Sequence, residues 1–299
     1  MFSLSTWLHL RFPFSFFLMP VYFFALAHSP NFTESRIIWS FLIIHLLLYP
    51  ASNGYNSYFD KDEKSIGGLK NPPPVKKGLY FVSLLMDIAA VVLALKISFL
   101  FASMLFIYGL ASKAYSHPSI RLKKMPIVGW LVTGFFQGFF TFLMCYEGIN
   151  AFGIYGLLNF NILIPATLTT IMLLGNYPMT QIYQHEEDSK RGDKTLSILL
   201  GIKGTFAFTA IVFAVATLGF VLYFIIFFKV KYAIAFVASL TPVLLFFFIW
   251  FIQSQKNTGV VNYSRTMWLN FISAVCLNGF FIYFFLDFSQ VIQAVKAGF

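Results

Sequence analysis

The sequence is poor in charged residues and in cysteine, and each shortage excludes a class of protein. Only 11% of its 299 residues are charged, while 59% are hydrophobic and 40 are phenylalanine. A water-soluble domain of this size could not bury so much apolar surface, so we expect the chain to lie in lipid. The two cysteines, Cys145 and Cys276, stand in apolar runs without the spacing of metal ligands, which predicts packing residues and no disulfide framework.

Acidic residues are the scarcer charged group, at 11 against 21 lysines and arginines, and the formal net charge is +10. In a membrane protein such an excess is typical of basic cytoplasmic loops that face anionic headgroups. We therefore expect membrane lipids, and no nucleic acid, among the partners. The sequence also has no Ser/Gly/Pro-rich linker and no low-complexity tract, which predicts one integral-membrane domain over residues 1–299.

Apolar runs of about 20 residues predict helices that span the bilayer. The sequence predicts an all-α membrane protein, a bundle of nine such helices at residues 8–27, 37–58, 79–95, 97–111, 127–146, 162–183, 204–228, 232–251 and 267–286. With a cytoplasmic N-terminus, 16 of the 21 basic residues fall on the cytoplasmic side, as the positive-inside rule predicts. The expected location is a bacterial cell membrane. Ala25-Leu26-Ala27 also resembles a signal-peptidase site, but cleavage there would leave the later helices oriented as before.

Seven of the 11 acidic residues fall in two loops on that cytoplasmic face. Those after the second and the sixth predicted helix are Asp60, Asp62, Glu63, Glu186, Glu187, Asp188 and Asp193. The stretch PASNGYNSYFD at 50–60 also resembles PMTQIYQHEED at 178–188. At a constant offset of 128 residues, the like-for-like positions are Pro50 and Pro178, Ser52 and Thr180, Asn53 and Gln181, Tyr55 and Tyr183, Asn56 and Gln184, and Asp60 and Asp188.

The spacing within each copy predicts that its polar residues share one helical face. Asn56 and Asp60 are four residues apart, and the second copy repeats this spacing with Gln184 and Asp188. A proline inside each span is expected to break or kink the helix. Two such faces opposite each other would offer hard oxygen ligands, which suit Mg²⁺, an ion that takes one or two carboxylates together with waters and substrate phosphates. Lysines close by would offset the charge of those phosphates. The alternative is a pair of solvated helix ends capped by polar side chains.

At these motifs the sequence resembles the UbiA superfamily of intramembrane prenyltransferases. The family's first motif, Asn-x-x-x-Asp-x-x-x-Asp, is matched by Asn56 and Asp60, with Asp62 as an additional acid. Its second, Asp-x-x-x-Asp followed by Gly and Lys-Thr-Leu, resembles QHEEDSKRGDKTLSILLG. The segment YSHPSIRLKKMPIVGW resembles the Tyr-Ser…Lys-Arg loop after the family's fourth helix. Two positions depart from the pattern, because Lys64 and Gln184 stand where the family has acids.

The resemblance implies a UbiA-like bundle whose active site faces the cytoplasm and transfers a prenyl group from a polyprenyl diphosphate to an aromatic or isoprenoid-lipid acceptor. Loss of diphosphate would leave an allylic cation, which needs a dry pocket. The residues that it implies to be catalytic are Asp60, Asp188 and Lys123. The implied ligands of the Mg²⁺ cofactor are Asn56, Asp60, Asp62, Gln184, Glu187 and Asp188. The implied diphosphate-binding residues are Lys123, Lys124, Lys194, Tyr115, Asn53 and Gln181.

Two further polar residues have more than one possible role, and two functions other than prenyl transfer stay open. Asp87 lies in the middle of a predicted helix, where an acid either serves the acceptor pocket or is paired within the bundle. His185 is expected beside the Mg²⁺ ligands, since Mg²⁺ rarely uses imidazole. A secondary transporter or lipid carrier stays open, because interrupted helices matched between two halves also indicate a transporter site. So does a UbiA-like member with altered or lost catalysis, given Lys64 and Gln184.

Overall fold

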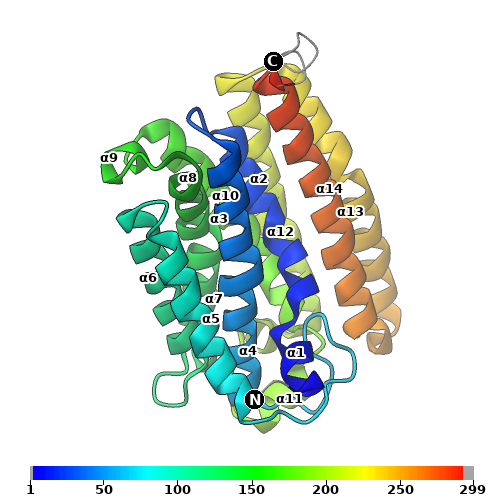
Figure 1. Ribbon diagram of the computed structural model, residues 1–299. Coiled ribbons are helices and arrows are strands. Elements are labelled where there is room, and N and C mark those ends of the chain that lie inside the picture. Colours follow the sequence, from blue (N-terminus) through cyan, green and yellow to red (C-terminus); the bar gives the residue numbers. More distant parts are fainter. Residues whose placement is uncertain (1–2, 292–299) are drawn as a thin grey trace.

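The computed structural model describes residues 3–291, a set of apolar helices that run side by side, with no β-strand in that range (Figure 1). In chain order the elements are α1 (Leu4–Leu10), η1 (Phe12–Leu18), α2 (Met19–Ala27), α3 (Glu34–Leu42), η2 (Ile43–Leu48), α4 (Tyr49–Asp60), α5 (Gly78–Ala94), α6 (Phe99–Ser116), η3 (Leu122–Lys124), α7 (Pro126–Phe135), η4 (Phe136–Phe140), α8 (Thr141–Asn150), α9 (Ile154–Leu157), α10 (Phe160–Gln181), α11 (His185–Lys190), α12 (Leu196–Phe227), α13 (Val230–Lys256), η5 (Thr258–Val260) and α14 (Tyr263–Phe288). The all-α prediction is confirmed.

The number of helices that can span a bilayer differs from the predicted nine. Within residues 3–291, eight continuous helical runs are long and apolar enough to cross a bilayer: Leu4–Ala27, Glu34–Asp60, Phe99–Ser116, Pro126–Asn150, Phe160–Gln181, Leu196–Phe227, Val230–Lys256 and Tyr263–Phe288. The remaining predicted span is α5, which has 17 residues. At a rise of about 1.5 Å per residue it is roughly 25 Å long, shorter than a hydrocarbon core of about 30 Å. The count of nine is therefore not confirmed.

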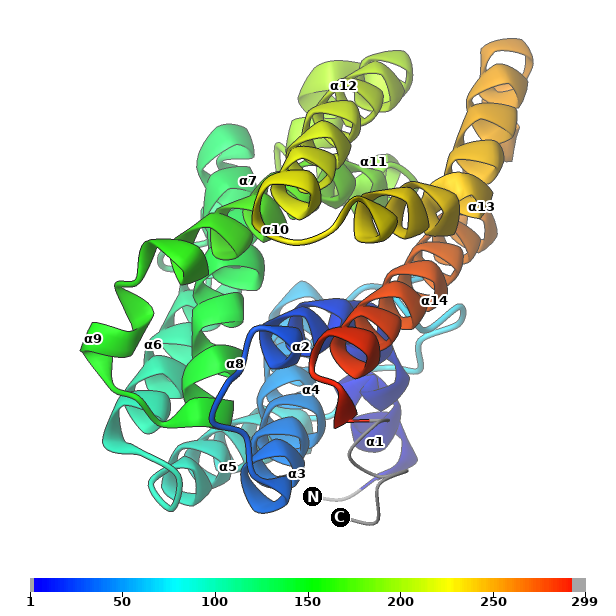
Figure 2. The same ribbon diagram turned by 90° about the horizontal axis from the view of Figure 1, so that it is seen from above.

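The outer surface of the bundle is apolar, as a lipid solvent requires. Phe99, Ile211 and Ile226 are 80%, 66% and 68% exposed on the helix exteriors, while Phe24 and Phe224 are buried between helices. In Figure 2, α5 and α6 lie on one side of the molecule and α12 and α13 on the other, with α2 and α14 between them. Because exposed side chains of this kind cannot be solvated well by water, they indicate an integral membrane protein.

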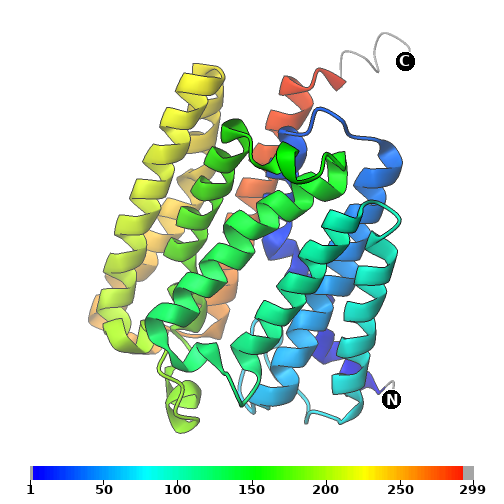
Figure 3. The ribbon, with the colours of Figure 1, turned by 90° about the vertical axis from the view of Figure 1, so that its left-hand side faces the viewer.

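Both acidic motifs lie at the same end of the bundle. The helices α1 and α11 mark this end, and α14 finishes at the opposite one (Figure 1). Motif one closes α4 at Asp60, and motif two follows the end of α10 at Gln181. Figure 3 shows α11 below the ends of the spanning helices. The predicted placement of both loops on one face therefore agrees with the fold, while the side of the membrane that this face occupies stays a prediction.

The two motif prolines act differently, although the sequence predicts a break or kink at each. Proline has no N–H, so Pro50 cannot bond the carbonyl of Leu46. The run from α3 to α4 includes a π-helical turn, η2, directly before Pro50. Helix α10 instead continues through Pro178 and ends three residues later. The interruption in the second copy therefore lies between Gln181 and α11.

Candidate active site

A polar cavity of about 250 Å³ opens at the motif end of the bundle and is lined by residues from both motifs. Its charged lining residues are Arg11, Asp60, Asp62, Lys123, Asp188 and Arg191. Of the other predicted site residues, those that also line it are Asn53, Asn56, Tyr115, Gln181 and Gln184. The structure therefore brings segments that are far apart in the sequence around one space: the ends of α4 and α10 and the loop after α6.

Asp60 lies at the centre of the motif-one side. The predicted helical face is present, since Asn56 Nδ2 donates to Asp60 Oδ2 at 2.9 Å across one turn of α4. Lys123 Nζ donates to the same oxygen at 2.7 Å, and Arg121 Nη2 donates to Oδ1 at 3.2 Å. Lys61 then adopts a left-handed conformation (φ 48°), which ends α4 and turns the chain toward Asp62. Asp60 is therefore held by donors from its own helix and from η3.

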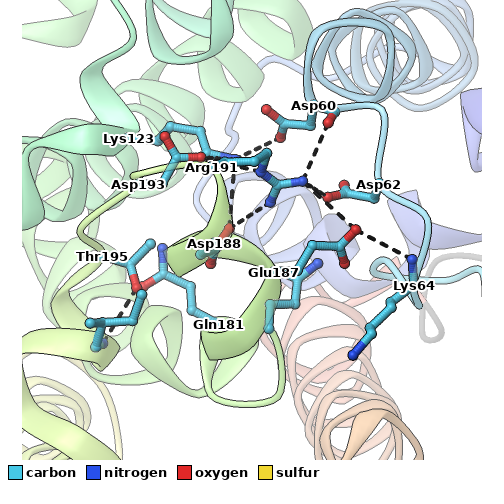
Figure 4. Close-up of polar contacts among 12 residues, drawn as sticks. Asp60, Asp62, Lys64, Lys123, Gln181, Glu187, Asp188, Arg191, Asp193 and Thr195 are labelled. Carbon is cyan, nitrogen blue, oxygen red and sulfur yellow. Dashed lines mark hydrogen bonds and ion pairs between the residues drawn. The ribbon is translucent and has the colours of Figure 1, made fainter.

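Arg191 joins the two motifs across the cavity (Figure 4). Its Nη1 donates to Asp62 Oδ1, and its Nη2 donates to Asp188 Oδ1 at 2.7 Å. Burial raises the pKa of Asp62 to about 6, an effect that the nearby Asp60 carboxylate increases and Arg191 opposes. Burial also raises the pKa of Asp188, against the attraction of Lys123 and Arg191. The carboxylates of the two motifs thus share one guanidinium.

Lys123 forms the second link between the motifs. Its ammonium lies 2.7 Å from Asp60, 3.3 Å from Asp193 and 3.9 Å from Asp188. Burial works against the charged form, yet these three carboxylates together hold the pKa of Lys123 above its usual range. The lysine is therefore a fixed cation at neutral pH, directed into the cavity and suited to a phosphate.

The inner wall of the cavity is made of aromatic and amide side chains. The Tyr115 and Tyr177 hydroxyls are hydrogen-bonded to each other, and Gln181 Nε2 donates to the Tyr177 hydroxyl at 3.2 Å. Gln181 Oε1 and Asn270 Oδ1 are buried without a hydrogen-bond partner, and both residues line the cavity. Because buried polar atoms normally have partners, these two oxygens indicate a site that a ligand or an ion completes.

Three predicted site residues do not reach the cavity, and the helical geometry explains each. Lys124 follows Lys123 in the tight turn η3, where successive side chains point in different directions, and it is exposed. Lys194 is exposed next to the buried Asp193. Glu187 precedes Asp188 on α11, and its Oε1 instead accepts the Glu63 N–H at 2.8 Å. The interpretation of Lys124, Lys194 and Glu187 as direct ligands is therefore not supported by their positions.

The two residues that depart from the family pattern, Lys64 and Gln184, make contacts between the loops of the two motifs. Lys64 Nζ pairs with Glu186 Oε2 at 2.6 Å, at the exposed surface. Gln184 lines the cavity, but its Nε2 donates to the Ser65 carbonyl at 3.3 Å. His185 bonds Ser197 Oγ at 2.7 Å, away from the motif carboxylates. Lys64 and Gln184 therefore hold the loops of the two motifs together, while His185 joins α11 to α12.

Asp87 takes the structural one of its two predicted roles. Its carboxylate pairs with Lys113 Nζ between α5 and α6, and it does not line the cavity. The same ammonium lies 5.3 Å from the centre of the Tyr55 ring. The geometry therefore offers no support for Asp87 in an acceptor pocket.

Sequence reasoning missed three charged residues that organise the site, namely Arg121, Arg191 and Asp193. Arg121 Nε and Nη2 each donate to Asp193 at 2.8 Å, a two-point contact inside the fold. Arg191 stands three residues after Asp188, a helical neighbour spacing that could have indicated the pair. No local pattern indicates that Arg121 and Asp193, 72 residues apart, are partners.

The sequence model of the UbiA prenyltransferase family matches residues 17–272. The chain belongs to this family. Among curated proteins, none matches the sequence. This UbiA-family chain also has the fold of several solved structures. Because the sequence identity is low, the comparison shows likeness of fold alone.

Three solved structures illustrate this likeness of fold. A UbiA homologue from Archaeoglobus fulgidus bound to DMAPP and Mg²⁺ has 13% identity and a TM-score of 0.67, over 95% of this chain and 99% of that one. The same homologue bound to GPP and Mg²⁺ has 13% identity and a TM-score of 0.65, over 94% and 99%. A digeranylgeranylglyceryl phosphate synthase has 18% identity and a TM-score of 0.60, over 94% and 98%. Each comparison covers nearly the whole of both chains.

The residues present suit a divalent metal in their chemistry, although cations of the chain lie among them. Asp60, Asp62 and Asp188 offer hard carboxylate oxygens on one cavity, and Gln181 adds an unpartnered amide oxygen. Within residues 3–291, no three acidic, histidine or cysteine side chains come close enough to hold a metal together. The reason is visible in Figure 4, where Arg191 lies between the aspartates. A metal therefore fits once these ion pairs rearrange.

Proposed function

We propose that the chain transfers a prenyl group from a polyprenyl diphosphate to a hydrophobic acceptor, an aromatic compound or an isoprenoid lipid, within the membrane and with Mg²⁺. The observation that carries the proposal is the convergence of Asp60, Asp62, Asp188 and Lys123 on one cavity at the end of an apolar bundle. Membership of the UbiA family and the two motifs support the same reaction class. The motif end then faces the cytoplasm, as the distribution of basic residues predicts.

The diphosphate end of the substrate would lie against the charged wall. Asn56, Asp60, Asp62 and Asp188 would hold Mg²⁺, with Gln181 close by, and Mg²⁺ when bound supplies Lewis-acid stabilisation of charge on the departing diphosphate. Lys123 would bind the phosphate oxygens as a fixed cation, and Tyr115 would border that position. Such preorganised charge is usually the largest contribution to catalysis of this kind.

The prenyl chain would extend from the polar cavity into apolar space. Asn176 lines the polar cavity and two further cavities of about 70 and 460 Å³. The smaller lies among Phe17, Phe24, Phe220 and Phe281, and neither is lined by a charged residue. An isoprenoid chain is apolar, so its burial there is favourable and keeps water from the reacting carbon.

The chemistry requires little beyond this arrangement. The bond between the first prenyl carbon and the diphosphate oxygen breaks, and its electron pair leaves with the diphosphate, whose oxygens Lys123 binds. The nucleophilic atom of the acceptor then bonds to that carbon, and the proton that it loses passes to the released diphosphate. The aromatic walls formed by Tyr108, Tyr115 and Phe136 exclude competing water.

The direct test is a transfer assay on the purified protein in detergent or lipid nanodiscs. Radiolabelled farnesyl or geranylgeranyl diphosphate is supplied with Mg²⁺ and a panel of aromatic and isoprenoid-alcohol acceptors, and labelled lipid products are counted. We expect Asp60→Ala and Asp188→Ala each to reduce turnover by at least about 100-fold, because each removes a carboxylate that would hold the Mg²⁺ needed to stabilise the departing diphosphate.

The matched control is Asp287→Asn at the opposite end of the bundle. Asp287 pairs with Lys231 at the surface, far from the motifs, so its variant should retain the wild-type rate. Wild-type turnover in both Asp60→Ala and Asp188→Ala would contradict the site assignment. A folded wild-type protein that transfers no prenyl group to any acceptor would instead favour a carrier or a member with lost catalysis.

A further inference from the structure

The charges that line the cavity balance without any ligand. Three carboxylates face it, those of Asp60, Asp62 and Asp188, and so do three cations from Arg11, Lys123 and Arg191. One shell further out, the buried pair of Arg121 and Asp193 adds one charge of each sign. A single divalent ion would leave this buried site positive, and a diphosphate alone would leave it negative.

Among these cations, Arg191 is the one that the other side chains of the site could least replace as a partner of the aspartates. Asp62 forms a salt bridge with Arg191 and, within the described residues, with no other cation. The same guanidinium binds Asp188 at 2.7 Å, and its Nη1 lies 3.3 Å from the Asp60 carbonyl oxygen. The side chain is 19% exposed and lines the cavity, so it can reach a ligand there. Removing it leaves two buried aspartates, one from each motif, without their shared partner.

The empty site therefore resists a metal that arrives alone. Mg²⁺ must displace a guanidinium from the carboxylates, and a displaced buried cation without a new partner is costly. A diphosphate changes this cost, because its oxygens accept two parallel hydrogen bonds from arginine. Arg191 can then turn from Asp62 and Asp188 to the phosphate oxygens, which frees the aspartates for Mg²⁺. The substituted positions Lys64 and Gln184 act in the same direction, since they provide no additional carboxylate to bind metal unaided.

We propose that Arg191 is the internal counter-ion of the empty site and a diphosphate ligand of the loaded one, so that Mg²⁺ and diphosphate bind together and Mg²⁺ alone binds weakly. This inference rests on the proposed function and specifies the order in which its site is filled. It assigns a role to Arg191, which lies between Asp188 and Gly192 at a position that the family pattern does not specify.

The test measures binding without turnover, using the full chain in detergent at pH 7.5. Mn²⁺ replaces Mg²⁺ and is followed by electron paramagnetic resonance, and preformed Mn²⁺–pyrophosphate is titrated by calorimetry. Arg191→Gln should bind Mn²⁺ alone about tenfold more tightly than the wild type, because the competing cation is gone, and Mn²⁺–pyrophosphate about tenfold more weakly, because the paired donors to phosphate are gone. The matched control is Lys190→Gln, which removes the same charge from the adjacent, exposed residue and should match the wild type in both titrations.

The outcomes separate this inference from the proposed function. Equal affinity of Arg191→Gln and wild type for Mn²⁺ alone overturns the inference, while Mn²⁺–pyrophosphate binding by the wild type still supports the function. A wild type that binds no Mn²⁺–pyrophosphate overturns both. If Arg191→Gln does not purify as a folded protein, the wild type decides, because Mn²⁺ alone bound as tightly as Mn²⁺–pyrophosphate contradicts joint loading. Arg191→Lys, which keeps the charge but not the paired donors, should lose affinity for pyrophosphate while its affinity for Mn²⁺ alone stays at the wild-type value.

Discussion

Lys123 and Lys124 are adjacent in the sequence, yet only Lys123 lies in the cavity. Likewise Asp188 lines the cavity and Glu187 does not, and Asp193 is buried behind the cavity while Lys194 is exposed. Neighbouring side chains on a tight turn or a helix point in different directions, so one residue of a charged pair is directed toward the site and the other away from it. At the scale of single residues, the motifs therefore contain fewer ligands than charges.

Asp62 leads to a prediction about pH, because burial raises its pKa from 3.8 to about 6. A raised pKa means that the folded state favours the protonated acid. The resulting stabilisation is fully present below the pKa that Asp62 has in the unfolded chain, near 4. It is lost as pH rises through about 6, which lowers the free energy of unfolding by up to about 3 kcal/mol. We expect Asp62→Asn, which cannot titrate, to gain thermal stability relative to the wild type between about pH 4.5 and 7.5.

The measurement is the melting temperature of both proteins, without metal or substrate, followed by tryptophan fluorescence at several pH values. The difference between the two proteins removes the contribution of all other titrating groups. A difference that stays constant with pH would show that Asp62 titrates alike in the folded and unfolded chain.

At the scale of helices, the two matched motifs are not built alike. Motif one lies within α4, where Asn56 and Asp60 share a face, as the spacing predicts. Motif two lies after the end of α10, where Gln184 directly precedes the separate short helix α11 and its carbonyl accepts the Asp188 N–H at 2.9 Å. The Glu187 carboxylate accepts the backbone N–H groups of Glu63 and Lys64 and so fastens α11 to the loop of motif one. Each predicted pair four residues apart therefore shares a face, but in the second copy Gln181 lies on α10 and not on the helix that carries Asp188.

A second helix-scale feature, the contact between η4 and α10, leads to a stability prediction. A Cβ on Gly138 would lie 2.5 Å from Thr170 Cα and 2.8 Å from its backbone nitrogen, so the two backbones would have to separate. The Phe139 N–H donates to Thr170 Oγ1 at 2.7 Å and depends on the same close approach. We expect Gly138→Ala to destabilise the protein by about 1–3 kcal/mol and to lower its melting temperature by a few degrees.

Gly279→Ala on α14 is the control for this prediction, because a Cβ at that position meets nothing within 4 Å. It should leave the melting temperature in detergent unchanged. If both variants melt at the wild-type temperature, the close packing of η4 on α10 is not important for stability.

At the scale of the whole molecule, function depends on which end of the bundle carries both motif loops. The chain places them together with α1, while the short helix α9 lies at the other end (Figure 1). Asn176 lines both the polar cavity and an apolar cavity next to it. A substrate with a charged head and an apolar chain can therefore be accommodated along the bundle. The arrangement suits a ligand whose apolar chain comes from the membrane and whose charged head comes from the aqueous phase.

Orientation in the membrane is testable with cysteines introduced at the two ends, in a background with Cys145 and Cys276 replaced by alanine. Lys194→Cys lies at the motif end and Tyr155→Cys on α9, and both native side chains are exposed. We expect a membrane-impermeant maleimide to label Tyr155→Cys on intact cells and Lys194→Cys only after permeabilisation, because the basic loops are cytoplasmic. The reverse labelling pattern would contradict the predicted orientation.

The sequence by itself determined what depends on composition and on residues close in the chain. Its apolar runs specify lipid-embedded helices, because backbone groups in lipid must bond within their own helix. The spacing of Asn56 and Asp60 specifies their hydrogen bond, and the motif letters indicate the family. What only the tertiary structure decided are contacts between distant segments, such as Arg191 with Asp62, 129 residues apart, and Lys123 with Asp60, 63 apart. Such pairs depend on how whole helices pack, and packing responds to the shapes of many side chains at once, which no local spacing records.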